Sequence, residues 1–387
     1  MREGCVLVRP WSSFVVNNEV TEGILTSSQV PKQFFYSLDA IRGIAAILVM
    51  LRHTEPFWGV VSFQESYLAV DVFFLMSGVV ICQAYEYRLQ SGLSVPGFTW
   101  IRVVRIYPLY VLGSSLTIMA TLLGINIEGG VEGHFFLFLV LGFLLLPNPG
   151  LGQPTFLFPF DHPAWSLFSE LVINILYAVI LRFLTARVLT SIMLISALGM
   201  AASIYLSHLH DLNAGWTFKG IPAGFFRVGY SFFAGVLLYR WFKSQKHVAS
   251  ISWYAPLIPW LVLVGVTELL MSAPPITIAP YFDFIAVIAI FPAIIYLGML
   301  FQPAGKSAQI CKFLGETSFA VYVLHSPIAH LIQGILHYHN VASIENYAPW
   351  VGFCFIILLL PICWLLDKFY DWPVRRFLLS LRPHTHR

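Results

Sequence analysis

The sequence predicts an all-α integral membrane protein with about ten transmembrane helices. Of its 387 residues, 58% are hydrophobic and only 11% are charged, whereas soluble globular proteins carry about 25% charged residues. The hydrophobic residues gather in runs close to the roughly 20 residues that a helix needs to cross a bilayer. The 33 Phe and 11 Trp suit lipid-facing and interfacial positions. The net charge of +3 gives no indication of a nucleic-acid partner.

Eleven apolar segments are candidates for membrane spans. They cover residues 37–57, 66–87, 104–124, 135–147, 165–184, 188–207, 223–241, 254–272, 281–301, 315–336 and 349–367. The segment 135–147 is the weakest, because it is short and ends in Pro-Asn-Pro-Gly, which breaks a helix. The number of crossings therefore depends on this segment.

The positions of the basic residues decide between ten and eleven crossings. If 135–147 crosses, most basic loops of the second half of the chain face away from the cytoplasm. If it does not cross, a large group of Lys and Arg residues lies on the cytosolic side, as the positive-inside rule requires. That group is Arg88, Arg102, Arg105, Arg182, Arg187, Arg240, Lys243, Lys246, Lys306, Lys312, Arg375 and Arg376. We therefore expect ten spans, cytosolic termini, and a re-entrant or interfacial segment at 135–147 within an outer loop.

The remaining predictions concern the terminal tails, the domain and the cysteines. We expect a cytosolic tail at 1–33, one transmembrane domain at 34–373 and a short cytosolic tail at 374–387. The first tail has no continuous apolar core, so it does not read as a signal peptide. The five cysteines form no CxxC motif, and we expect neither a disulfide framework nor a metal site.

The first span, SLDAIRGIAAILVMLRHTEPF, carries charge that a purely structural helix avoids. A charged side chain near the bilayer centre costs at least about 2.5–3.5 kcal/mol. Arg42 begins the segment, and Arg52 and His53 lie near its end. At about 100° per residue, Arg42 and His53 fall on one helix face, and at 1.5 Å per residue they are about 16 Å apart along the axis. This face is the first candidate for a functional site.

The second span contains the polar residues Asp71 and Ser77. Ser77 precedes a glycine, which also suits close packing of helices through small residues. Asp71 falls near the expected depth of His53 and Arg52. We therefore expect Asp71 to be the counter-ion of one of these two residues.

The third span begins with Arg102 and Arg105, which are adjacent on one helix face. They suit positive-inside anchoring, and they equally suit an anion clamp, because the planar guanidinium binds phosphate in a bidentate manner. Together with Arg42 they would place three guanidinium groups at the cytosolic side. Such a cluster fits a phosphate-rich cytosolic ligand.

The segment at 165–184 begins with Ser166 and Glu170. Ser166 suits a helix cap, whereas Glu170 lies deeper than a cap requires. Near the end of the chain, Ser318, Tyr322 and His325 share a helix face at spacings of four and three residues. His325 suits either a hydrogen-bonded packing group or part of the site.

These stretches together resemble the acyltransferase-3 family of bacterial integral-membrane O-acyltransferases. The matching pieces, in order, are SLDAIRGIAAILVMLRHT, VDVFFLMSGVVI, RVVRIYP, PAWSLFSE and LGETSFAVYVLH. The chain has Ala40 where glycine is common in the family, which is a small departure. The soluble C-terminal domain that the family often adds is not expected here.

The resemblance implies transfer of an acyl group, usually acetyl, from acyl-CoA to a hydroxyl, commonly on a sugar, at the bacterial cytoplasmic membrane. It implies a catalytic role for His53 and acyl-CoA binding by Arg42, Arg102 and Arg105. No bound cofactor is expected, since acyl-CoA is a substrate. The acceptor is expected to be a carbohydrate or lipid-linked sugar.

For the chemistry we expect a neutral His53 to act as general base, with Asp71 or Glu170 orienting it. Arg52, Ser77 or Tyr322 would donate hydrogen bonds to the oxyanion, and an acyl-serine relay is a variant. We expect the acceptor to enter from the outer side.

Two other classes of function also fit a membrane protein with buried charge. One is a carrier for an anionic or sugar-linked substrate, against which the sequence shows no inverted repeat. The other is a structural or regulatory component that keeps the fold without the chemistry. The sequence leaves open the acceptor, the length of the acyl group, the role of Arg52 and the oligomeric state.

Overall fold

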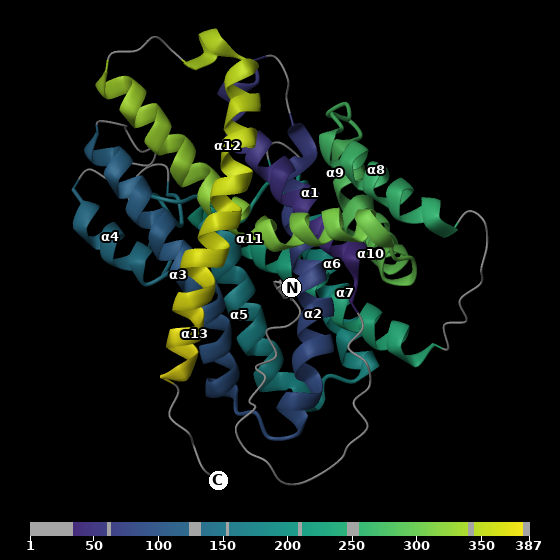
Figure 1. Ribbon diagram of the computed structural model, residues 1–387. Coiled ribbons are helices and arrows are strands. Elements are labelled where there is room, and N and C mark those ends of the chain that lie inside the picture. The colour runs from purple at the N-terminus through teal and green to yellow at the C-terminus, as the bar shows by residue number, and fades with distance from the viewer. Residues whose placement is uncertain are drawn as a thin grey trace, which may run out of the picture.

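The computed structural model describes residues 34–59, 63–123, 133–151, 155–207, 211–245, 255–339 and 344–381. The expected tail at 1–33 lies outside these residues. The described part is helical, and its only β-type pairing is an isolated bridge between Phe156 and Thr217. Its α-helices are α1 (Tyr36–His53), α2 (Ala69–Gln90), α3 (Val95–Leu122), α4 (Phe135–Phe143), α5 (Ala164–Ile180), α6 (Ala186–Leu206), α7 (Ile221–Ser244), α8 (Ile258–Met271), α9 (Ala279–Ile285), α10 (Phe291–Leu300), α11 (Gly305–Tyr338), α12 (Trp350–Leu366) and α13 (Trp372–Ser380). Figure 1 shows them as one bundle.

Eight helical stretches of the described chain are long and apolar enough to cross a membrane, so the all-α membrane class is confirmed. They are Gln64–Gln90, Val95–Leu122, Ala164–Phe183, Ala186–Leu206, Phe218–Ser244, Ala279–Leu300, Gly305–Leu336 and Trp350–Ser380. Two further expected spans correspond to α8, which is a shorter apolar helix, and to α1, which contains Asp39, Arg42 and Arg52. A total of ten crossings stays a prediction.

The weak segment forms α4, a helix of nine residues. At about 1.5 Å per residue such a helix is roughly 14 Å long, less than half the thickness of a bilayer core. Tyr107 and Tyr110 on α3 donate hydrogen bonds to the carbonyls of Phe143 and Gly142. These two carbonyls at the C-terminal end of α4 thereby gain the partners that the helix itself does not provide. The chain then turns through Leu145, whose φ is +52°. Hence α4 is too short to cross the bilayer as a helix.

Two pairs of helices form the centre of the bundle, and each pair is parallel. On α1 and α11, Arg42 contacts Ser318 and His53 contacts His325, so residue numbers rise together. On α2 and α7, Asp71 contacts Arg227 and Glu86 contacts Arg240 in the same sense. The first and ninth spans, and the second and sixth, run in the same direction when 135–147 does not cross. The parallel pairs therefore support that arrangement.

Glycines allow these helices to approach closely. An added Cβ at Gly78 would lie 2.0 Å from the carbonyl oxygen of Phe232, and one at Gly235 would lie 2.0 Å from that of Leu75. In the same way a Cβ at Gly43 would lie 2.5 Å from the Cβ of Leu314. Small residues at such crossings are typical of membrane helix pairs.

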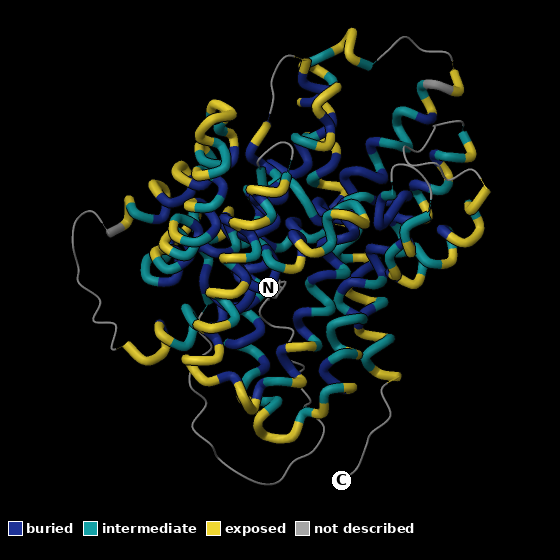
Figure 2. Tube along the Cα trace, turned by 180° about the vertical axis from the view of Figure 1, so that it is seen from behind, coloured by how far each residue is buried: buried dark blue, intermediate teal, exposed yellow. Residues whose placement is uncertain are grey.

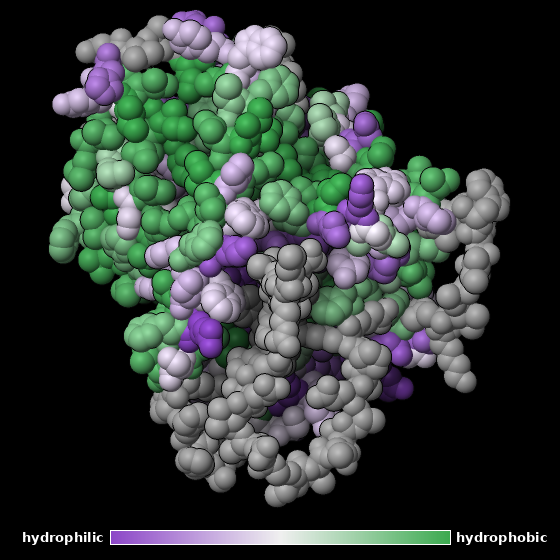
Figure 3. All heavy atoms as spheres, viewed as in Figure 1, coloured by the Kyte–Doolittle hydropathy of each residue, from purple (hydrophilic) through white to green (hydrophobic). Residues whose placement is uncertain are grey.

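The distribution of buried and exposed residues also fits a helical bundle. Figure 2 shows buried residues gathered inside the bundle and exposed ones along its outer helices and loops. Apolar side chains cover much of the upper part of the face in Figure 3, with hydrophilic ones across its middle. The exposed residues of α6 and α4 include Leu194, Leu198 and Phe136, as expected for surfaces in contact with lipid.

Candidate active site

An open pocket in the bundle contains all three arginines that the sequence singles out. It encloses about 770 Å³, including its mouth, and helices α1, α2, α3, α5 and α11 line it. Its polar lining residues are Arg42, Ser77, Arg102, Arg105, Ser166, Glu170, Ser318 and Tyr322. The pocket is well inside the bundle, since about 20 Å of helix separates Ser77 from the end of α2 at about 1.5 Å per residue.

Arg42 and Arg102 are each paired with a carboxylate. Arg42 contacts Asp39 one turn earlier on α1 and donates from Nε to Ser318 Oγ at 3.0 Å. Arg102 Nη2 lies 2.8 Å from Glu170 Oε1. These partners hold the guanidinium groups in place within a pocket of otherwise apolar helices.

Glu170 lies among the arginines, not beside His53. Its Oε1 accepts hydrogen bonds from Arg102 and from Ser77 Oγ, the latter at 2.9 Å. The expectation that Glu170 orients His53 is wrong, because its carboxylate binds Arg102 and Ser77 instead.

Ser166 and Tyr322 form a directed hydrogen-bond chain at the pocket wall. Ser166 Oγ donates to the carbonyl of Pro163 at 2.8 Å. The serine hydroxyl has one proton, so Tyr322 donates to Ser166 Oγ across 2.5 Å. The Tyr322 ring also meets Phe73 edge to face, with 5.1 Å between centroids. These side chains close the pocket on the side of the histidines.

His53 and His325 form the second part of the site. His53 Nδ1 and His325 Nε2 lie 3.0 Å apart, and His325 Nδ1 lies 2.9 Å from the carbonyl oxygen of Val321. A carbonyl only accepts, so His325 Nδ1 carries a proton. In a neutral pair His325 Nε2 then accepts from His53 Nδ1–H, and His53 Nε2 keeps its lone pair. The contacts thus define which nitrogen of His53 is basic.

The two histidines differ in accessibility. The His325 side chain is fully buried, whereas His53 is exposed and does not line the arginine pocket. The Tyr322 ring, which does line the pocket, lies 6.2 Å from the His325 ring. Tyr322 therefore contacts both the pocket and the histidine pair.

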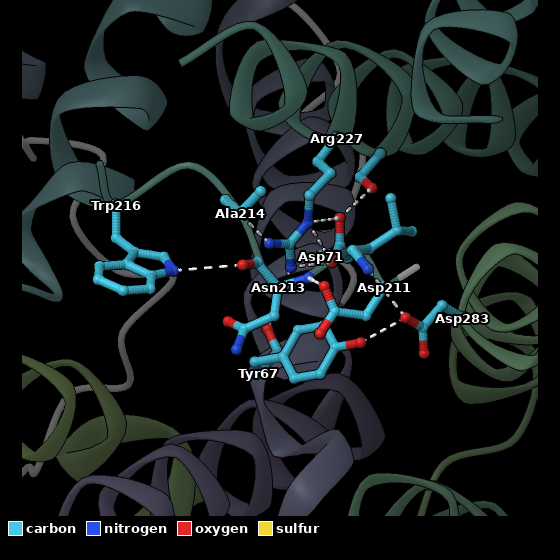
Figure 4. Close-up of polar contacts among 10 residues, drawn as sticks. Tyr67, Asp71, Asp211, Asn213, Ala214, Trp216, Arg227 and Asp283 are labelled. Carbon is cyan, nitrogen blue, oxygen red and sulfur yellow. Dashed lines mark hydrogen bonds and ion pairs between the residues drawn. The ribbon is translucent and has the colours of Figure 1, made fainter. Parts of the chain in front are cut away.

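Asp71 is the centre of a different cluster. Its carboxylate binds Arg227 on α7, with Nη2 at 2.5 Å, and accepts from Ser231 at 3.3 Å. Arg227 also donates to the carbonyls of Ala214 and Tyr67. Figure 4 shows Asp71 and Arg227 side by side, with Tyr67 bridging to Asp283. The expectation that Asp71 is the counter-ion of His53 or Arg52 is therefore wrong.

Arg52 contacts residues that follow it closely in the chain. Its Nη1 donates to the carbonyls of Phe63 and Gln64 at 3.2 and 2.6 Å. Its guanidinium lies 5.3 Å from the centre of the Tyr67 ring. Arg52 thus ties the end of α1 to the 3₁₀ segment Gln64–Leu68 that leads into α2.

Comparison with known proteins connects this site to a family. The profile of the acyltransferase-3 family, described as an acyltransferase domain, matches residues 35–368. The chain belongs to this family. It is also 42% identical over 165 residues to "Protein 2 in picA locus" of Rhizobium radiobacter, a stretch that covers 39% of this chain and 84% of that protein. No solved structure matches the chain.

The family assignment makes the chain a multi-pass membrane acyltransferase. The matched region contains every residue that the sequence singled out for the site. Within it, the fold brings Arg42, Arg102, Arg105 and Glu170 into one pocket.

Several partners in the acyltransferase were missed at the level of sequence. Arg227 and Asp283 both lie in apolar stretches, and the rule that buried charge marks an important position applies to them as well. Asp39 lies within the first matching piece, yet only the helix geometry shows that it binds Arg42.

Proposed function

We propose that this acyltransferase moves an acyl group, most simply acetyl, from acyl-CoA to a hydroxyl of a carbohydrate or glycoconjugate at the membrane, with His53 as general base. The observation that carries the proposal is the convergence of Arg42, Arg102 and Arg105 on one pocket. Cationic forks suit the phosphates of CoA. The apolar lining beside them suits an extended acyl-carrying arm.

The arginine partners are compatible with an anionic donor. Glu170 pairs with Arg102, and Asp39 pairs with Arg42. A carboxylate oxygen is an anionic hydrogen-bond acceptor, as a phosphate oxygen is. The phosphates of the donor would therefore replace these carboxylates at the guanidinium groups. No cofactor is needed, because acyl-CoA is a substrate.

The chemistry follows from the histidine pair. His53 Nε2 accepts the proton of the acceptor hydroxyl while its oxygen attacks the thioester carbonyl. The tetrahedral intermediate then collapses, the C–S bond breaks, and the CoA thiolate takes the proton from the imidazolium. His325 stabilises this imidazolium through the hydrogen bond that it accepts from Nδ1, as the aspartate does in a Ser-His-Asp triad. The thioester must reach past Tyr322 to approach His53.

The two substrates would approach from different sides. The arginine pocket serves the donor, whereas His53 is exposed, does not line that pocket and suits an acceptor. In a bacterial cytoplasmic membrane with both termini cytosolic, that side is the outer one. The parallel helix pairs support the ten-span arrangement on which this assignment depends.

Acyl transfer in position-53 variants tests the proposal. We expect His53→Ala and His53→Gln to lose about 10²–10⁴-fold in acyl transfer, the usual contribution of a general base. His339→Ala, at an exposed position after α11, is the matched control and should keep full activity. Full activity in a correctly inserted His53→Ala protein would refute the proposed base.

A second measurement separates transferase from carrier. Purified protein in detergent, where no gradient exists, should transfer or hydrolyse labelled acetyl-CoA. Mass spectrometry of surface glycans from cells with and without the protein should show a shift of one acyl group, which identifies both donor and acceptor. Uptake without transfer would instead support a carrier.

A further inference from the structure

Arg105 differs from the other pocket arginines in how it is held. Its guanidinium lies over the ring of Phe319, 4.1 Å from the ring centre. Its Nη1 lies 3.7 Å from Asp371 Oδ2. Phe319 is on α11 and lines the pocket, whereas Asp371 does not line it. An aromatic face and a carboxylate therefore define the plane and direction of this guanidinium.

Asp371 is a buried charge with a second partner. Its side chain is fully buried, and its carboxylate also contacts Arg375, which is 2% exposed. Arg375 in turn binds Asp367 at 3.3 Å. Buried ion pairs contribute little net stability against apolar alternatives, so they are weak evidence for a purely stabilising role. One carboxylate shared by two guanidiniums is instead well suited to fixing a position.

The backbone around Asp371 is also unusual. Residues Asp367–Asp371 form a π-helical segment between α12 and α13, and such single turns are frequent at functional sites. Within this turn the Tyr370 hydroxyl donates to the carbonyl of Pro108 on α3 at 3.2 Å. Pro108 lies one turn after Arg105, so the segment is anchored on α3 directly beside the arginine.

Asp371 and Arg375 lie beyond the region that the family profile matches, which ends at residue 368.

We infer that Asp371, held by Arg375, is a positioning residue that orients Arg105 towards the phosphates of the acyl-CoA donor. The inference rests on the proposed function, since it assumes an anionic donor in the arginine pocket. Asp371 itself does not line the pocket and acts through Arg105. Its loss should weaken recognition of the phosphate-bearing part of the donor and leave the chemical step intact.

The experiment compares two donors on the same variants. Acetyl-CoA carries the nucleotide phosphates, and acetyl-pantetheine lacks them. We expect Asp371→Asn to raise the KM for acetyl-CoA about threefold to tenfold, because Arg105 loses the attraction of a carboxylate 3.7 Å away. Its kcat and its KM for acetyl-pantetheine should stay within about twofold of the wild type. Asp371→Glu, which keeps the charge, should restore part of the acetyl-CoA affinity.

Glu86→Gln is the matched control. Glu86 pairs with Arg240 between α2 and α7, away from the pocket. Its substitution removes a partly buried ion pair, so it lowers stability without changing the ratio of the two KM values. If Asp371→Asn does not fold, Arg375→Lys replaces it, because a single ammonium cannot bind both carboxylates in the same way.

The outcomes separate the two proposals. One outcome is that the KM for acetyl-CoA is unchanged or lower in folded Asp371→Asn but higher in Arg105→Lys. This outcome overturns the positioning role of Asp371 and leaves the proposed donor site standing. If Arg105→Lys and Arg102→Lys also change the KM values of the two donors by the same factor, the proposed donor site itself is refuted. A selective rise in the acetyl-CoA KM in both Asp371→Asn and Arg105→Lys, non-additive in the double variant, supports the inference.

Discussion

His53 Nδ1 and His325 Nε2 lie 3.0 Å apart and connect α1 to α11 at the side of the pocket away from the arginines. His325 is fixed in turn by its bond to the Val321 carbonyl. This arrangement assigns the proton of each ring and leaves His53 Nε2 as the basic atom. Of the two roles that its sequence position allowed, this contact fits the proposal that His325 is part of the site.

The histidine pair predicts the effects of two substitutions at position 325. His325→Ala should lower kcat about 10²-fold, because His53 loses the acceptor that holds its tautomer and stabilises its cation. His325→Gln should keep part of the activity, since the amide oxygen accepts the same hydrogen bond. Steady-state kinetics on detergent-purified protein measures both. Equal kcat values for the Ala and Gln variants would argue against an orienting hydrogen bond.

The Asp71–Arg227 pair predicts a stability effect that is separate from catalysis. Arg227→Met leaves Asp71 buried without its cation and should cost about 3–5 kcal/mol. Asp71→Asn combined with Arg227→Met should recover part of this loss, because no charge is then left unpaired. Thermal unfolding in detergent checks the order of the three proteins. A double variant less stable than Arg227→Met would show that the charge pair is not the dominant interaction.

The crossing of α2 and α7 predicts which glycines tolerate a methyl group. Gly78→Ala places Cβ where the Phe232 carbonyl lies, so the helices must separate, at a cost of roughly 1–3 kcal/mol. Gly265→Ala on α8 meets no atom within 4 Å and should be neutral or slightly stabilising, because alanine favours the helix. Melting temperatures of the two variants provide the comparison. Similar values would mean that the crossing is loosely packed.

Asp161, in the loop before α5, predicts a pH dependence of stability. Burial raises the pKa of this carboxyl to about 8, above the value of about 3.9 expected in the unfolded chain. The folded protein therefore holds an extra proton between about pH 4 and 8, and stability falls as the pH rises through this range. The contribution is most favourable below about pH 4 and is lost as the pH approaches 8.

Asp161→Asn should remove this contribution, because the amide stays neutral. We expect the variant to be more stable than the wild type at pH 7 and above, and the difference to shrink towards pH 4. Melting temperatures from pH 5 to 9 in detergent measure the slope. Parallel curves for the two proteins would show that Asp161 does not titrate in this range.

Within the site, local sequence placed residues on helix faces correctly. The spacing of Arg42 and His53 predicted one shared face of α1, and both residues do contact α11. The spacing of Ser318 and His325 predicted the complementary face. Helix periodicity suffices for such statements, because both residues belong to the same rigid element.

Partners across helices were harder to predict. Glu170 and Asp71 were expected near His53 and instead bind Arg102 and Arg227. Depth along a helix can be estimated from sequence only to about a turn, and rotation about the axis relative to other helices not at all. An error of one turn, about 5.4 Å, is enough to exchange one counter-ion for another.

The sequence by itself determined that this chain is a helical membrane protein and that one face of the first span carries a cation and an imidazole, and it predicts that 135–147 does not cross. These properties follow from hydrophobic length, charge bias and helical period, which are local or additive along the chain. Only the tertiary structure decided which helices pack in parallel, which carboxylate neutralises each arginine, and that Asp371 approaches Arg105 from the last helix. Those contacts join residues far apart in the chain, and they depend on glycine crossings and helix rotations that no local pattern encodes.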